Sequence, residues 1–441
     1  MAAFLVGGAA LGVAAVDSLP LEARLHEINL PTVLRLAEAR NLDIQIAREK
    51  LAEARAAHES SILQFLPSIA PGISYRRHDN LIQDVAGNII DVRKQSYAPG
   101  FNFTARVDVG DAIYKELASR QSWRAAAHGL QAQREDSILS AVLAYFDLVK
   151  AEATIDATRE TQAIFKNYYE QIRRAVEAGL AFRGDELRVK VQTDRTELLL
   201  RRAGEQRRQA AARLAQALHL SQETDFHPDA RELVPLNLIS TDAPLEALIE
   251  EAVKSRAEIR QSASQLAATR AAKKGATVGP LIPSLGAQAY VGGLGGGPSG
   301  APDRFGESED LALFLSWRLG PGGLFDLGKI HASKARLAAA QLADQKLRED
   351  IGRQVVEGRE HFQSLSDQIS ILRQTLAAAT SAQQLSEQRK EFAVGAVLED
   401  IQTQQELALA RSDLAAAIAD FNKAQYSLLK ALGRFSNLSA R

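Results

Sequence analysis

The sequence predicts a mainly α-helical fold with a small β part, in which a unit of helix, strands and long helical hairpin occurs twice. The first observation is the absence of proline between Pro99 and Pro228 and again after Pro321. Proline inside a helix costs about 3 kcal/mol, so proline-free spans of this length favour long helices. The other two observations are an apolar seam within both spans and a set of matching segments in the two halves.

The apolar seam is a repeat of hydrophobic residues at alternating spacings of three and four. It runs through Leu139, Val142, Phe146, Val149 and Ala153 in the first span, and through Phe362, Leu365, Ile369, Leu372 and Leu376 in the second. This is the spacing of residues that face a partner helix in a coiled coil. Both spans therefore predict helices that pack lengthwise.

Each proline-free span contains one break, at 178–185 in the first and at 394–400 in the second. Gly179 and Gly395 are suited to the left-handed conformation that ends a helix. Asp185 and Asp400 follow shortly afterwards, and we expect each to cap the returning helix. Each span is thus predicted to be a helical hairpin, with a first outgoing limb of about 95 Å at 1.5 Å per residue.

The two halves match at an offset of about 216 residues, which indicates an internal duplication. Phe146 corresponds to Phe362 and Gly179 to Gly395 at this offset. We expect a first repeat over 28–220, a linker over 221–243, a second repeat over 244–434 and a tail over 435–441. Residues 1–20 are apolar and small, resemble the end of a secretory signal, and are otherwise expected to be a disordered N-terminus.

Each half also contains a predicted β-hairpin, at about 68–109 and 284–319. Strict alternation places apolar residues on one face of the second strand of each hairpin. The candidate lipid-facing residues are Phe101, Phe103 and Val107 in the first half, and Leu311, Leu313, Leu315 and Trp317 in the second. The intervening stretches, 79–93 and 292–310, are expected to be turns. Such strands fit either a transmembrane barrel or a half-buried sheet of a soluble domain.

The composition excludes several functions. There are 53 basic and 54 acidic residues, a balance that argues against a nucleic-acid binder. The chain has no cysteine, which excludes disulfides, thiolate metal sites and cysteine nucleophiles. Its eight histidines show no convincing metal-ligand spacing, and the glycine run 292–297 is not followed by the Lys-Ser/Thr of a phosphate loop. No catalytic residue, cofactor or metal is predicted, and the protein is not expected to be an enzyme.

The chain resembles the TolC-like outer membrane efflux protein family over about 28–434. The resemblance rests on the order of several short motifs, each present at its expected place. They are Leu34-Arg35-Leu36-Ala37-Glu38-Ala39-Arg40-Asn41, the junctions Leu66-Pro67-Ser68-Ile69 and Ile282-Pro283-Ser284-Leu285, the return Leu315-Ser316-Trp317-Arg318-Leu319 with Leu324-Phe325-Asp326-Leu327-Gly328, and the turn Gly179–Asp185. The second turn departs from the pattern, because Asp400 follows Gly395 by one residue fewer.

The resemblance implies a homotrimer in the outer membrane of a Gram-negative cell. Three chains would supply a twelve-stranded barrel in lipid and a twelve-helix tunnel through the periplasm. The implied partners are a periplasmic adaptor (membrane fusion protein) and an inner-membrane pump of RND or ABC type. The implied function is a passive exit duct for efflux or type I secretion. The candidate residues of the periplasmic aperture are Gly179, Arg183, Asp185, Gly395, Glu399 and Asp400. The alternative is a soluble or periplasmic coiled-coil scaffold or adaptor.

Overall fold

The computed structural model divides the chain into two compact units, each described by itself below. Unit 1 comprises 1–33, 143–234 and 372–419, and unit 2 comprises 34–142, 235–371 and 420–441. The structure describes residues 26–39, 41–70, 74–91, 94–221, 224–228, 233–240, 243–298, 304–391 and 397–435. The signal-like segment 1–20, Gly395 and the last six residues of the predicted tail lie outside the described residues.

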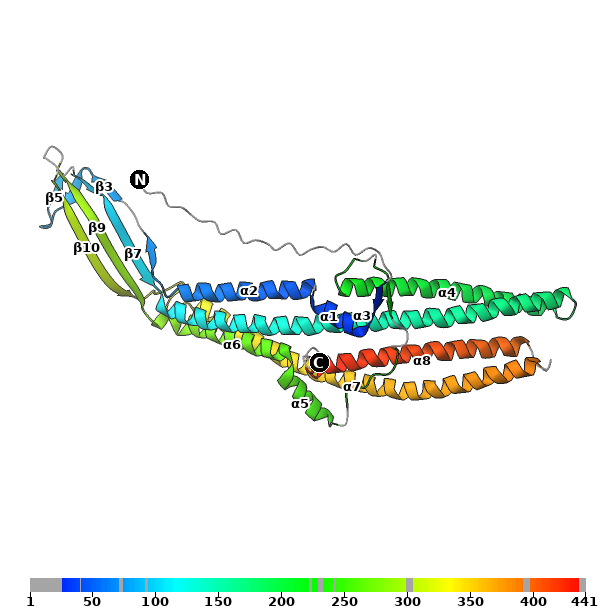
Figure 1. The fold of residues 1–441 in the computed structure, drawn as a ribbon. Coiled ribbons are helices and arrows are strands. Elements are labelled where there is room, and N and C mark those ends of the chain that lie inside the picture. Colours follow the sequence, from blue (N-terminus) through cyan, green and yellow to red (C-terminus); the bar gives the residue numbers. More distant parts are fainter. Residues whose placement is uncertain are drawn as a thin grey trace. The chain divides into compact units, whose positions relative to one another are not determined.

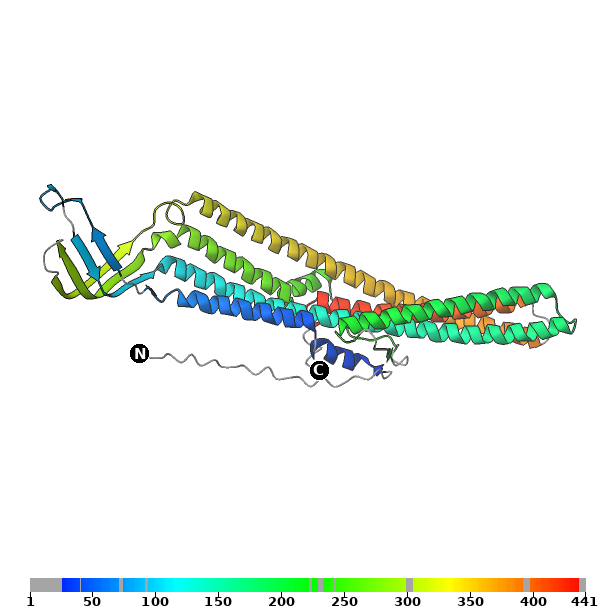
Figure 2. The same cartoon turned by 90° about the horizontal axis from the view of Figure 1, so that it is seen from above.

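Two helical hairpins dominate the fold, as predicted. The first consists of α3 (Val109–Glu177) and α4 (Arg183–Ala217), and the second of α7 (Leu327–Glu391) and α8 (Val397–Ala431). In both views the two helices of each hairpin run side by side (Figures 1 and 2). With 69 and 65 residues, α3 and α7 are each about 100 Å long at 1.5 Å per residue.

The predicted seam is the buried side of these helices. Val142, Phe146 and Val149 on α3 are almost fully buried, as are Leu365 and Ile369 on α7. Within unit 2 the seam closes through aromatic rings, since the Phe362 ring on α7 stacks on the Phe421 ring of α8 with a centroid distance of 5.1 Å. The spacing of three and four therefore marks real contacts between the limbs.

Each repeat begins with two short helices instead of the single helix that was expected. They are α1 (Leu30–Ala39) with α2 (Leu42–Leu63), and α5 (Leu245–Ser255) with α6 (Ala257–Thr277), followed by the 3₁₀ turn η2 (Gly279–Leu281). The break before α2 has a local cause, because the Asn41 side chain accepts hydrogen bonds from the backbone N–H groups of Asp43 and Ile44. An Asn in this position caps a new helix and interrupts the preceding one.

The main sheet lies in unit 2 (Figure 1). Its six strands occupy four antiparallel positions, here called paths, because β2 with β3 and β6 with β7 each share one position. The strands β2 and β3 pair with β7 and β6, which in turn pair with β9, and β10 pairs with the far side of β9. Their bounds are β2 Ser68–Ala70, β3 Ser74–His78, β6 Lys94–Ala98, β7 Gly100–Val107, β9 Ser284–Pro298 and β10 Arg304–Ser316. The hairpins of the two repeats thus join in one sheet through β7 and β9.

The stretches expected to be turns contain strands, which corrects the sequence prediction. Within 79–93 the structure places a small hairpin of β4 (Leu81–Gln83) and β5 (Ile89–Asp91). Within 292–310 the strands β9 and β10 continue to Pro298 and from Arg304. Aromatic rings explain the glycines of β9, since a Cβ added at Gly293 would lie 2.2 Å from the Phe305 ring and one at Gly295 would lie 2.5 Å from the Tyr97 ring. Neighbouring rings occupy the space that side chains of β9 would need.

An extended segment over 235–240 is fixed to α8 by two amide side chains in unit 2. Asn422 Oδ1 accepts the Leu236 N–H at 2.9 Å. Gln425 Oε1 accepts the Leu238 N–H at 2.8 Å, and its Nε2 donates to the Leu236 carbonyl at 2.9 Å. Both amide side chains are fully buried. The helix therefore offers this segment the donors and acceptors that a neighbouring strand would offer.

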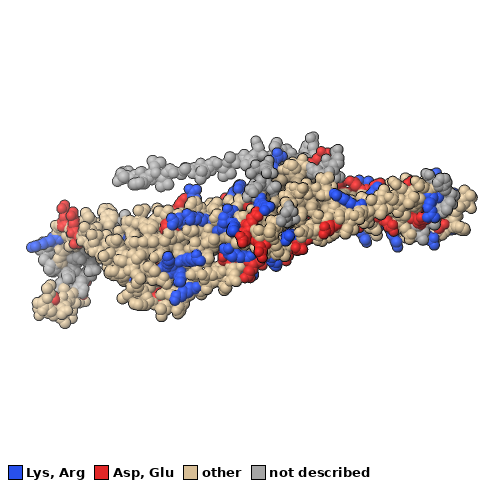
Figure 3. All heavy atoms as spheres, turned by 90° about the horizontal axis from the view of Figure 1, so that it is seen from below, with Lys and Arg blue, Asp and Glu red and all other residues tan. Residues whose placement is uncertain are grey.

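Two further features concern surface and environment. Over the described part of the chain, no helix carries an apolar stretch sufficient to cross a membrane. Basic and acidic side chains lie interspersed over the face that Figure 3 shows, in keeping with a formal net charge of −1.

Candidate functional site

The candidate site is the end of the helical hairpins in unit 1, and its first part is the turn between α3 and α4. Gly179 has a φ of +72°, which is the left-handed conformation that the sequence predicted for it. The Leu180 N–H donates to the Ala175 carbonyl at 2.8 Å, closing the end of α3. Leu180 and Phe182 are more than 80% exposed, at 84% and 82%. The turn therefore presents two large apolar side chains outward.

Neither predicted aspartate cap is a cap, which is a second correction. The residue before α4 is Phe182, and it makes no side-chain capping bond. Asp185 is the third residue of α4 and pairs with Arg188 at 3.4 Å, while Arg183 is exposed at the first position. Asp400 is likewise inside the first turn of α8. Both carboxylates still lie near the positive end of a helix dipole, where a negative charge is favourable.

Three helices meet just inside the turn. Phe165 and Tyr168 of α3, Val189 of α4 and Ile401 of α8 form one buried apolar cluster. Burial, and then the negative charges of Asp400 and Asp185, raise the pKa of Tyr168 to about 12. The two carboxylates that the duplication relates thus act on the same phenol. Asp400 is itself 8% exposed.

Ion pairs tie the limbs of the site together. Arg389 near the end of α7 donates from Nη1 to Glu399 Oε1 on α8 at 2.6 Å. Arg411 on α8 donates to Glu160 Oε2 on α3 at 2.7 Å. Both pairs are solvent-exposed, so each contributes at most about 1 kcal/mol. Glu399, which precedes Asp400 in sequence, is thus paired with Arg389, as Asp185 is with Arg188; together the three carboxylates form the acidic group of unit 1.

The structure shows residues that the sequence did not single out. Tyr168 and Arg389 are absent from the predicted site, although Tyr168 lies one turn from Phe165 in the buried apolar cluster. A tyrosine next to apolar residues, near the turn, was the available signal. Arg389 gave none, because its partner Glu399 lies across a break in the helix.

The candidate lipid-facing residues lie elsewhere, on the sheet of unit 2. Their side chains are solvent-exposed except for Val107, which is half-buried; Leu311 and Leu313 are the most exposed at 76% and 74%. Trp317 lies one residue beyond β10, where its Nε1 donates to the Leu281 carbonyl at 3.2 Å. Phe101 and Phe103 on β7 have adjacent rings with centroids 6.2 Å apart. The apolar face predicted by alternation is thus uncovered in the single chain.

Comparisons with known proteins agree on one fold. Residues 33–219 match the sequence model of the family described as outer membrane efflux protein. No match was found among curated protein sequences. A membrane protein from Pseudomonas aeruginosa is similar with a TM-score of 0.77 at 18% identity, covering 97% of this chain and 99% of that one.

Two solved channels are similar over comparable lengths. The CmeC outer membrane channel of Campylobacter jejuni gives a TM-score of 0.74 at 15% identity, covering 98% of this chain and 94% of that one. The MtrE outer membrane channel of Neisseria gonorrhoeae, solved in its open state, gives 0.72 at 18% identity, covering 92% and 88%. The first repeat is thus similar in sequence to the outer membrane efflux protein family, and the chain shares the fold of these solved channels over nearly its whole length.

Proposed function

We propose that the protein is the passive outer-membrane exit duct of a tripartite efflux or secretion system and works as a homotrimer. The observation that carries this proposal is the sheet of unit 2, whose four paths end in β2–β3 at one edge and β10 at the other. Because the strand direction alternates over four paths, the two edge strands of the sheet run in opposite directions. The β10 edge of one copy can therefore pair antiparallel with the β2–β3 edge of the next, and three copies close a twelve-stranded barrel without free edges.

The exposed apolar face of the sheet supports the same proposal. Leu311, Leu313 and Leu315 project from one face of β10, all at least 60% exposed. A contiguous apolar face of this kind is stable against lipid and unfavourable against water. The polar residues that alternate with the apolar ones on β7 would then face a lumen.

The acidic group of unit 1 is proposed to line the periplasmic aperture. In a trimer Asp185, Glu399 and Asp400 would recur three times around one axis. Rings of carboxylates raise the local concentration of cations and favour binding of multivalent ones. We assign no substrate preference to the duct itself.

The partners in this proposal are a periplasmic adaptor and an inner-membrane pump of RND or ABC type. The exposed Leu180 and Phe182 supply an apolar contact at the turn. A groove of about 600 Å³ in unit 1, between α3, α4 and α8, supplies a second surface; it is lined largely by small and amide side chains, among them Thr158, Gln192 and Gln405. Surfaces of both kinds accept helical hairpins of a partner.

The experiment has two independent parts. Native mass measurement in mild detergent should give a trimer, and a stable monomer or dimer would contradict the assembly. Planar-bilayer recordings should then show weaker cation selectivity and weaker block by divalent ions in Asp185→Asn/Asp400→Asn than in the parent. Asp194→Asn, an exposed carboxylate elsewhere on α4 that pairs with Lys190, is the matched control. Unchanged selectivity in the double variant, with an intact trimer, would remove the aspartates from the aperture and leave the duct in place.

A further inference from the structure

The sheet in unit 2 has two edges, at β10 and at β2–β3. Among the strands that the structure describes, β10 pairs only with β9, and β2 pairs only with β7 (Figure 1). An edge presents a row of backbone N–H and C=O groups that readily pairs with another chain. The trimer proposed above joins the β10 edge of one copy to the β2–β3 edge of the next, but it does not define which residues lie opposite each other.

The internal duplication relates the two hairpins of the sheet residue by residue. The Pro-Ser junction that begins β2 corresponds to the one that begins β9, so Ser68 is the counterpart of Ser284. Ser68 lies opposite Arg106 of β7, and Ser284 lies opposite Ser316 of β10. Ser316 is therefore the counterpart of Arg106, and the residues that follow these two positions correspond in the same way.

The two repeats of one chain meet between β7 and β9. Arg106 of β7 lies opposite Gly286 of β9. The same register continues past the end of β7, because the Ser284 hydroxyl donates a hydrogen bond to Asp108 Oδ1. This interface joins the second hairpin strand of one repeat to the first hairpin strand of the repeat that follows. In a closed ring of copies, β10 and the next copy's β2 stand in the same relation.

We propose, as a refinement that rests on the trimer of the proposed function, that the interface between copies repeats the register of β7 and β9. This register places Ser316 opposite Ala70 of the next copy, and Arg318 opposite Ser68 of the next copy. These four residues are the counterparts, in the same order, of Arg106, Gly286, Asp108 and Ser284. A closed barrel needs a fixed stagger between its strands. Interfaces of one register, alternately within and between chains, distribute that stagger evenly around the barrel.

The charges along the two edges agree with this pairing. Antiparallel pairing brings the first half of β10 alongside β3 of the next copy. By sequence, this half of β10 contains Glu307, Glu309 and Asp310, and β3 contains Arg76 and Arg77. Opposite charges on adjacent strands attract, whereas two β10 edges or two β3 edges would repel each other. The register is assigned at β2, because the pairing of the first hairpin shifts between β2 and β3.

The chain has no cysteine, so introduced cysteines test the register in the full-length protein. The two pairs in register are Ser316→Cys with Ala70→Cys, and Arg318→Cys with Ser68→Cys. Exchanging the partners gives Ser316→Cys with Ser68→Cys, and Arg318→Cys with Ala70→Cys. The exchanged pairs use the same four substitutions but are two residues out of register.

Geometry separates the two kinds of pair. Opposite residues of an antiparallel pair have Cα atoms about 4.5–5.5 Å apart, which a disulfide can bridge. Diagonal neighbours are about 7–8 Å apart, which is beyond its reach. Both cysteines of one chain would lie at opposite edges of its own sheet, so each disulfide must join two copies.

The variants are purified in mild detergent, oxidised gently and run on a denaturing gel without reductant. Both pairs in register should give covalent dimers and trimers that reductant converts to monomer. The exchanged pairs should remain monomeric on the gel, as should the four single variants. Native mass measurement of the reduced variants reports assembly separately, and each substitution occurs once in register and once out of register, so a defect of assembly shows itself in both.

The outcomes distinguish this register from the proposed function. An assembled trimer in which an exchanged pair cross-links as well as the pairs in register, or in which neither pair in register cross-links, would overturn the register and leave the exit duct in place. A parent protein that is not a trimer would contradict the proposed function and the register with it.

Discussion

Gln425 is the side chain whose removal should most clearly loosen the segment over 235–240. Gln425→Met keeps the length of the side chain and removes both of its hydrogen bonds, to the Leu238 N–H and to the Leu236 carbonyl. An unsatisfied buried polar group costs about 1–3 kcal/mol. Leu236 and Leu238 are only half-buried, so the lower end applies to each and the total is about 2 kcal/mol.

A loss of about 2 kcal/mol corresponds to about a 30-fold larger opening equilibrium constant for this segment, and hence to about 30-fold faster exchange. Hydrogen exchange at the amides of Leu236 and Leu238 measures it directly. Gln402→Met, on an exposed position of the same helix, should leave these amides unchanged. Exchange in Gln425→Met within about threefold of the parent would show that water replaces the amide bonds at little cost, and the reasoning would fail.

Three further outcomes are expected. Burial is the main cause that raises the pKa of Glu135. The folded protein therefore holds this proton more tightly than the unfolded chain, and it loses stability as the pH rises through the raised pKa. Glu135→Gln should raise the thermal unfolding temperature at pH 7 by about a degree or two and leave it unchanged at pH 4. Tyr168, with a pKa of about 12, should ionise well after an ordinary tyrosine in a spectrophotometric titration, and Tyr168→Phe should remove the loss of stability between pH 10 and 12. Leu313→Lys should impede membrane assembly by about 2–4 kcal/mol in a folding gel assay, and Phe103→Asp should impede it by less, whereas Thr104→Lys on the opposite face should assemble normally.

The helical part of the fold could be predicted from the sequence because its determinants are local. The absence of proline, the spacing of seam residues such as Val142 and Phe146, and the glycine at 179 each determine the backbone only of residues close to them in sequence. The positions of Asp185 and Asp400 after a glycine suggested caps, but α4 begins two residues before Asp185 and α8 three before Asp400. Helix boundaries depend on which residue first adopts helical angles, and spacing alone does not determine that.

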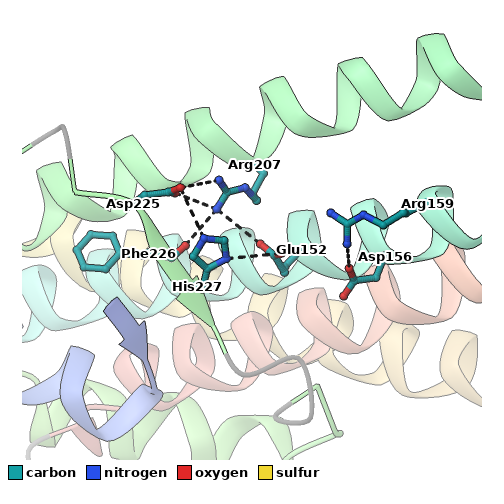
Figure 4. A network of polar contacts seen from close by, with 7 residues as sticks. All are labelled: Glu152, Asp156, Arg159, Arg207, Asp225, Phe226 and His227. Carbon is teal, nitrogen blue, oxygen red and sulfur yellow. Dashed lines mark hydrogen bonds and ion pairs between the residues drawn. The ribbon is translucent and has the colours of Figure 1, made fainter. Parts of the chain in front are cut away.

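The features that the sequence did not predict depend on residues distant along the chain. The glycines of β9 indicated a turn, because the rings of Tyr97 and Phe305 that cover them belong to other strands. The ion pairs of Arg207 on α4 with Asp225 and with Glu152 on α3 join three separate segments (Figure 4), and no spacing rule connects Arg207 with Glu152. Only the fold brings these groups together.

The glycine-rich β9 also bears on the order of folding. A strand with so few side chains has little tendency to form by itself, since glycine gains no packing energy and loses the most conformational entropy. Within the second half its partner is β10, and its other edge pairs with β7 and β6 of the first half. Expressed separately, each half could form only its own pairs, and the second half would leave one edge of β9 without a partner strand. The two hairpins of this duplicated protein thus complete one sheet only when they fold together.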